Sequence, residues 1–269
     1  MAATLTSHDL SILEKIKDPE SGPSAPLLIS ADLPRDPHLS DPLIYQRVTA
    51  KERDIITSIQ AAELQLAGLK SALPESPLEQ YQRSLTSLDA LVEEHPNYAS
   101  ARNNRAQALR RIYGDGLLVR NPSAAPGETS QILDPSASDS TLSSVASIIL
   151  DDLTTSIRLL TPSNPFSPIS ATAAKTLSQS YTQRGAIYHL TAKRLSMDGA
   201  ELRIEESRQE RSWSVVDFEE NASRDFVLGG RYGNEIAKAL AVSTNPTAKL
   251  CGDMVKEAMR KEYAGGGMV

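Results

Sequence analysis

Two stretches that lie far apart in the chain carry the same short pattern. "NNRAQALRR" at 103–111 and "TQRGAIYHL" at 182–190 each place an arginine directly before a small residue, which is Ala106 in the first and Gly185 in the second. An upstream stretch offers Gly68 at the equivalent place. A small residue lets a second helix approach closely, because a large side chain there would force the two helices apart. Since repeated units bury their apolar faces against one another, this repetition predicts a stack of similar helical units.

The rest of the chain also favours helices. Apolar residues recur at helical spacing through residues 55–69 and 78–92. Strand-like alternation is nowhere sustained, and aromatic residues make up only 4% of the chain, as expected for layered helices rather than a sheet. Residues 18–26, 121–140 and 161–168 collect Pro, Gly and Ser and are expected to be loops. The sequence therefore predicts an all-α protein.

The helix pairs resemble the tetratricopeptide repeat, a helix-turn-helix unit of about 34 residues with small residues at fixed places and a closing proline. This resemblance implies a tetratricopeptide-repeat alpha-alpha superhelix of about three helix pairs plus a C-terminal capping helix. In the third pair, Phe218 is expected to be the aromatic residue of the second helix.

The expected domain organisation follows from the repeats. Residues 1–50 are predicted to be an N-terminal extension that is partly disordered, and the repeat domain is predicted over 51–263. The parts of the domain are repeat 1 at about 51–96, repeat 2 at about 97–162 with an inserted loop at 117–141, repeat 3 at about 169–230, and capping helices at 231–263. A second insertion, at 192–214, lengthens the third repeat either as a loop or as a longer helix.

Charge and composition exclude several classes of protein. The formal net charge is -6 and the pI is about 5.4, which argues against a nucleic-acid-binding surface or a polybasic membrane patch. The single cysteine, Cys251, rules out an intramolecular disulfide framework. The N-terminus lacks the features of a secretory signal, and no apolar run reaches the length of a membrane helix. We therefore expect a soluble, cytoplasmic protein.

No pattern of catalytic residues stands out. The four histidines are scattered without metal-ligand spacing, and the glycine-rich stretches lack the spacing and lysine of a phosphate loop. Asp151 and Asp152 fit the solvated face of a helix better than a catalytic pair. Cys251 fits a small packed residue better than a reactive thiol. We expect a protein without enzymatic activity, without a metal or cofactor, and without a small-molecule substrate.

Three stretches resemble the tetratricopeptide repeat protein 36 family. They are "NNRAQALR" at 103–110, "YTQRG" at 181–185 and the tail "NPTAKLCGDMV" at 245–255, and "HDLSILEKIKDPE" at 8–20 is similar to the segment that precedes that family's repeats. The resemblance implies a fungal-like member with insertions. It also implies a non-enzymatic adaptor, linked to Hsp70 binding and to tyrosine metabolism through protection of a catabolic enzyme from degradation.

The inner face of such a stack is the expected binding site for a protein or peptide. Repeats that hold chaperone C-termini do so with lysine, arginine and asparagine, since fixed cations bind a carboxylate well. By position, only Asn104 matches that set here, so the cations of the clamp are missing. The alternative is that Asn103 and Asn104 bridge neighbouring helices without any ligand. The expected peptide-binding groove comprises Gln65, Leu69, Asn103, Asn104, Gln107, Arg110, Gln179 and Gln183.

Two functions of different classes remain open. The first is an adaptor that holds a metabolic enzyme or a chaperone such as Hsp70 in its groove. The second is a structural assembly factor, for example in ciliary or other complexes, that acts through self-association. The tail at 245–263, with Leu250, Met254 and Met259 on one side, either caps the last repeat or docks on a partner.

Overall fold

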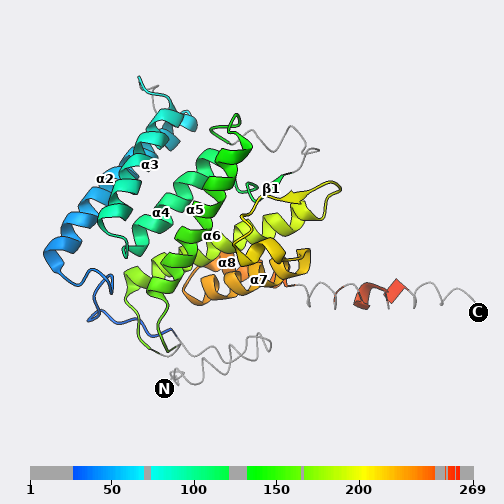
Figure 1. Ribbon diagram of the computed structural model, residues 1–269. Helices are drawn as coiled ribbons and strands as arrows, with labels where there is room; N and C mark the ends of the chain where they lie inside the picture. The colour runs from blue at the N-terminus through cyan, green and yellow to red at the C-terminus, as the bar shows by residue number, and fades with distance from the viewer. Residues whose placement is uncertain are drawn as a thin grey trace, which may run out of the picture.

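The computed structural model describes residues 27–69, 74–120, 132–164 and 167–245, together with 252, 254–257 and 259–260. This part of the chain is mostly helical, which confirms the all-α prediction. Figure 1 shows the helices as a row that runs from α2 and α3 to α7 and α8. The elements are α2 (Pro42–Leu66), α3 (Pro77–Glu94), α4 (Ala99–Tyr113), β1 (Val119–Arg120), α5 (Asp139–Leu160), α6 (Ala171–Leu195), β2 (Glu201–Leu202), the 3₁₀ helix η2 (Gln209–Ser212), α7 (Val215–Arg231) and α8 (Glu235–Thr244).

Several helix starts are encoded by their local sequence. Ser76 accepts a hydrogen bond from the backbone N–H of Glu79, and the Glu79 carboxylate accepts one from the backbone N–H of Ser76 at 2.8 Å. This reciprocal cap satisfies two N–H groups that a helix start leaves without partners. Ser214 and Asp217 form the same cap at the start of α7. These caps fix where the second helices of the first and third pairs begin.

The helices pack in chain order. Each contacts the next one along the sequence, and α4 also contacts α6. Buried leucine, isoleucine and alanine side chains from α4 to α8 form a continuous apolar core. Smaller apolar clusters lie between α2, α3 and α4. The arrangement places α2, α4 and α6 as the first helices of consecutive pairs, with α3, α5 and α7 as their second helices.

An arginine on α4 joins the second helices of two pairs. Arg105 donates to Asp89 on α3 at 2.9 Å and to Asp152 on α5 at 2.6 Å. The side chain of Asp152 is fully buried, whereas that of its neighbour Asp151 is 65% exposed. The expectation of a solvated face is therefore wrong for Asp152, because this carboxylate is the internal partner of Arg105.

Arg184 on α6 makes the equivalent pair of contacts. It donates to Asp225 on α7 at 2.7 Å and to Thr154 on α5 at 3.3 Å. Arg105 and Arg184 thus each link the second helix of their own pair to that of the preceding pair. The repeated arginine therefore occupies structurally equivalent positions in the second and third pairs.

Gly185 packs closely against α7, as its place in the pattern predicts. A Cβ at this position would lie 3.1 Å from the ring of Phe226 and 3.2 Å from the carbonyl oxygen of Ala222. The aromatic residue over this glycine is thus Phe226, and the expectation for Phe218 is wrong. Phe218 instead lies edge-on to Trp213, a residue that the second insertion supplies.

Gly68 does not occupy an equivalent place, so this part of the repeat prediction is wrong. It follows the end of α2 with a φ of 68°, and a Cβ there would have no heavy atom within 4 Å. Its role is to let the chain leave the helix in the left-handed conformation that glycine adopts readily. The small buried residue of α2 is Ala62, which lies in the apolar cluster with Tyr81 and Leu88.

The two insertions meet each other. Strand β1 in the first insertion pairs antiparallel with β2 in the second, with Val119 opposite Leu202. Leu117 and Leu118 are buried in the main core. The inserted loop expected over 117–141 is therefore ordered at its start and ends where α5 begins at Asp139, while residues 121–131 lie outside the described residues.

The first helix begins earlier than the expected start of the repeat domain, and the tail is described only in part. Residues 42–50 belong to α2 rather than to an extension, and Ile29 forms a parallel bridge with Ile169 ahead of α6. Residues 1–26 lie outside the described residues, and so does Leu250 in the tail. Of the expected capping helices, α8 packs on α7. Met254 and Met259 in the tail are exposed.

Candidate functional site

The first helices α2, α4 and α6 share a face that is held together by polar side chains. Asn104 on α4 donates to Oε1 of Glu52 on α2 at 2.8 Å, and Tyr98 donates its hydroxyl to the other carboxylate oxygen. Arg111, two helical turns after Asn104 on the same side of α4, donates to Glu63 on α2 at 2.7 Å. These contacts join α4 to α2 at two places along α2, at Glu52 and at Glu63.

On its other side, α4 is joined to α6 by a cluster of amides. The side-chain oxygen of Asn103 accepts a hydrogen bond from Gln183 at 2.8 Å and one from the hydroxyl of Ser180 at 3.0 Å. Arg110 donates to the side-chain oxygen of Gln183 at 2.9 Å and is held in turn by Asp115 at 2.8 Å. Asn103 and Gln183 are buried, so both amides are used within the fold.

The structure brings together only part of the predicted groove. Asn103, Gln179, Gln183 and Arg110 lie in one cluster between α4 and α6, with Gln179 accepting a long 3.4 Å contact from Asn103. Asn104 points the other way, toward α2. Asn103 and Asn104 therefore each form hydrogen bonds to a neighbouring helix. This agrees with the alternative interpretation, in which the two asparagines bridge helices.

The remaining predicted residues lie apart from this cluster. Gln65 accepts a 2.9 Å hydrogen bond from Gln80 on α3, within its own helix pair. Leu69 lies beyond the end of α2 and is exposed. Gln107 is exposed on α4, between the sides that face α2 and α6. Among the predicted groove residues, Gln107 and Gln179 are thus the two glutamines that are exposed to solvent on the face shared by α2, α4 and α6.

Glu52 is the central residue that sequence reasoning missed. Burial raises the pKa of this carboxyl, while hydrogen bonds from Tyr98, Ser100 and Asn104 partly offset the rise. Burial also raises the pKa of Asp36, a second carboxyl close enough to interact with Glu52. A glutamate inside an otherwise ordinary amphipathic helix gives little sign of burial, because its partners come from residues about 50 positions away in the sequence.

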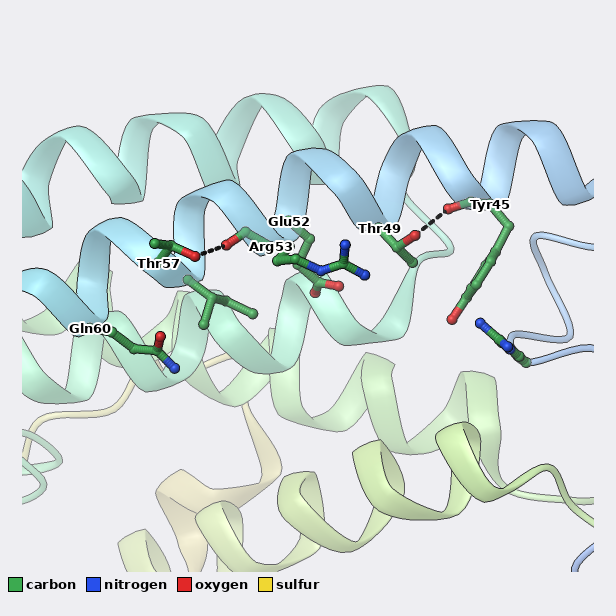
Figure 2. A pocket seen from close by; sticks show the side chains of 8 residues that line it. Tyr45, Thr49, Glu52, Arg53, Thr57 and Gln60 are labelled. Carbon is green, nitrogen blue, oxygen red and sulfur yellow. Dashed lines mark hydrogen bonds between the residues drawn. The ribbon is translucent and has the colours of Figure 1, made fainter.

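Beside Glu52, an open hollow of about 320 Å³ runs along α2. Figure 2 shows Thr49, Arg53, Thr57 and Gln60 in a row along this helix. The hydroxyls of Thr49 and Thr57 bond to carbonyl oxygens one turn earlier, at 2.8 Å each. The side chains of Arg53 and Gln60 are exposed at this hollow. The arrangement offers polar contacts over an open surface and no enclosed chamber for a small molecule.

The described residues form neither a metal site nor a membrane span. Nowhere in this part of the chain do three or more His, Cys, Asp or Glu side chains gather as a metal site would need. Likewise, none of the helices over these residues has the length and apolar character required to cross a membrane.

The fold and this face define a helical protein built from consecutively packed pairs, with polar bridges between its first helices. No protein-family model matches the chain, and no solved structure matches it. A curated relative from Aspergillus fumigatus, the L-tyrosine degradation gene cluster protein hmgX, is 38% identical over 267 residues, which cover 97% of this chain and 94% of the relative. The chain belongs to the family of that protein.

Proposed function

We propose that this protein is a non-enzymatic tetratricopeptide-repeat adaptor that acts in tyrosine breakdown by binding another protein. The single observation that supports a role in tyrosine breakdown is the near-full-length similarity to a protein of an L-tyrosine degradation gene cluster. The equivalent contacts of Arg105 and Arg184 support the repeat architecture, since the same linkage recurs from one helix pair to the next. The resemblance to the tetratricopeptide repeat protein 36 family agrees with both.

The binding surface that we propose is the exposed part of the face shared by α2, α4 and α6. Stacked helix pairs use such a face to bind other polypeptides. Arg53 and Gln60 on α2, Gln107 on α4 and Gln179 on α6 supply donors and acceptors there. The buried amides beneath them set the spacing of the three helices. Binding of a chaperone tail through a carboxylate clamp is disfavoured, because Asn104 already bonds Glu52.

The partner that we propose is an enzyme of tyrosine catabolism in the cytoplasm, with Hsp70 as an additional partner. Full-length protein would be immobilised and exposed to the purified enzymes of tyrosine degradation, each added singly. Capture of one enzyme, and slower loss of its activity when the protein is bound, are the expected results. The double variant Arg53→Ala, Gln107→Ala should weaken capture at least tenfold, whereas Glu93→Ala on the second helix α3 should leave it unchanged.

Two results would contradict this function. Conversion of a tyrosine-derived intermediate by the protein alone would show an enzyme. A stable oligomer in size-exclusion chromatography that captures none of the enzymes would favour the structural assembly factor that acts through self-association.

A further inference from the structure

Two arginines line the hollow beside α2 without a carboxylate partner. Arg35, which precedes α2, and Arg53 on α2 both line this hollow of about 320 Å³. Both residues are exposed, and neither forms an ion pair within the part of the chain that the structure describes. By contrast, Arg111 on the neighbouring helix α4 is held by Glu63 at 2.7 Å. The hollow therefore presents two positive charges to a ligand that approaches from solvent.

The buried carboxyls near the hollow are engaged with other donors. The carboxylate of Glu52 accepts hydrogen bonds from Asn104 and Tyr98. The carboxylate of Asp36 accepts one from the backbone N–H of His38 at 2.8 Å. Because these oxygens bond within the fold, a carboxylate from outside can take the place of an ion-pair partner at each arginine.

Arg35 is held at one end of the hollow. The hydroxyl of Ser170, at the start of α6, donates to the backbone carbonyl oxygen of Arg35 at 3.0 Å. The side chain of Arg35 interacts with the hydroxyl of Tyr45 near the start of α2. Figure 2 shows Tyr45 at one end of the row of side chains and Arg53 farther along the helix. Two cations whose backbones are fixed bind a ligand at a lower cost in entropy than two mobile ones.

The remaining side chains of the hollow suit a polypeptide backbone. The hydroxyls of Thr49 and Thr57 already donate to carbonyl oxygens of α2, so toward a ligand they act as acceptors. Backbone N–H groups are matching donors. Ile56, which is half-buried, adds an apolar contact. These features fit an extended peptide better than a small inorganic anion, which has no donors for the threonines.

The positions of the two arginines predict a spacing in that peptide. Tyr45, beside Arg35, lies eight positions before Arg53 in α2, which corresponds to about 12 Å along the helix axis. An extended chain rises about 3.3 Å per residue, so about four residues cover this length. Side chains four positions apart in an extended chain point to the same side. Two carboxylates with this spacing can therefore reach both arginines together.

We propose that the hollow binds an acidic, extended segment of the partner protein, with one carboxylate at Arg35 and a second, about four residues away, at Arg53. This inference rests on the proposed function, because it names the chemistry of the segment that is bound there. Arginine forms charge-assisted, often bidentate hydrogen bonds with carboxylates. The chain has a formal net charge of -6, so an acidic segment gains little attraction from the rest of the surface. Recognition then depends on these two arginines.

Fluorescence anisotropy of the full-length protein with a dye-labelled peptide tests this pairing. The probe is a nine-residue peptide of serine and alanine that carries glutamate at its third and seventh positions. We expect saturable binding that weakens as the salt concentration rises. Replacing both glutamates with glutamine should weaken binding at least tenfold. Placing the two glutamates side by side should weaken it severalfold, because one of the two arginines then lacks a partner.

Reversing each charge of the hollow gives the complementary test. Arg35→Glu and Arg53→Glu should each weaken binding of the peptide at least tenfold. Arg47→Glu, at an exposed position of α2 outside the hollow, makes the same change in net charge and is the matched control, which should retain binding within twofold. All three side chains are exposed, so we expect unchanged thermal unfolding, which shows that the variants remain folded.

The outcomes separate this inference from the proposed function. Equal binding of the glutamine peptide, or an equal loss of binding in Arg47→Glu, would overturn the inference. So would a protein that captures an enzyme of tyrosine breakdown and binds no acidic peptide, and the proposed function would then stand. Peptide binding that requires both arginines in a protein that captures no such enzyme would support the acidic-segment site and contradict the proposed function.

Discussion

The side-chain amide of Asn104 donates a 2.8 Å hydrogen bond to the buried carboxylate of Glu52, and this contact ties α4 to α2. Asparagine is a weak helix former because its amide competes for backbone hydrogen bonds. At this position the amide is engaged across the helices instead, together with the hydroxyl of Tyr98. The unusual pair of asparagines in α4 is thus explained by its two neighbours, since Asn103 faces α6 and Asn104 faces α2.

The Glu52 contact makes stability depend on pH. Burial raises the pKa of Glu52 above its ordinary 4.5, so the folded state holds this proton more tightly than the unfolded state. The stabilising contribution of the protonated carboxyl is therefore present below about pH 4.5 and lost as the pH rises through the folded-state pKa. Glu52→Gln should be more stable than the wild type at pH 7, and the difference should disappear near pH 4. Urea unfolding of both proteins across this range measures it; a difference that grows toward low pH would contradict the assignment.

Adjacent aspartates on α5 should respond very differently to substitution. Asp152→Ala removes a fully buried partner of Arg105 and Arg102 and should lower the free energy of unfolding by about 3 kcal/mol. Asp151→Ala removes an exposed contact with Arg208 and should change it by less than about 1 kcal/mol. Thermal and urea denaturation of the two variants give the comparison. Equal losses would mean that Arg105 is not held by Asp152.

The close approach of α6 and α7 predicts the outcome of enlarging Gly185. Gly185→Val forces a side chain against Phe226 and should cost about 1–3 kcal/mol. Lys175→Val, at an exposed position of the same helix, controls for the lower helix propensity of valine and should cost less than about 1 kcal/mol. Unfolding by urea distinguishes the two. A tolerated valine at 185 would show that the helices do not depend on this contact.

Substitutions on the shared face should separate structural amides from binding amides. Asn103→Ala removes the side-chain oxygen that accepts from Gln183 at 2.8 Å and from Ser180 at 3.0 Å, and leaves the amide of Gln183 only the longer 3.3 Å contact with the backbone carbonyl. This change should destabilise the protein by about 1–3 kcal/mol. Gln107→Ala, on the exposed side of the same helix, should leave stability unchanged within about 0.5 kcal/mol. Measuring stability and enzyme capture for both variants tests this division. Loss of stability in Gln107→Ala without loss of capture would reverse the roles.

The sequence by itself determined the helical class and much of the repetition. Helical spacing of apolar residues and the capping signals at Ser76 and Ser214 act within a few residues, so they can be read locally. The arginine before a small residue marked equivalent places in α4 and α6, because both positions meet the same neighbours in the stack. Gly68 lies in a similar sequence pattern, but it occupies a helix end instead of a contact between helices. A glycine at a helix end and a glycine between helices look alike until the helix ends are known.

Only the tertiary structure decided which polar residues are buried and hydrogen-bonded between helices. Glu52 and Asp152 are both buried, although acidic residues in amphipathic helices are usually exposed. Their partners come from other helices, so no local pattern marks them. The pairing of β1 with β2 also joins two insertions that are far apart in the sequence, so no local pattern predicts it. Contacts between distant segments depend on how the helices stack, and that arrangement arises only when the whole chain has packed.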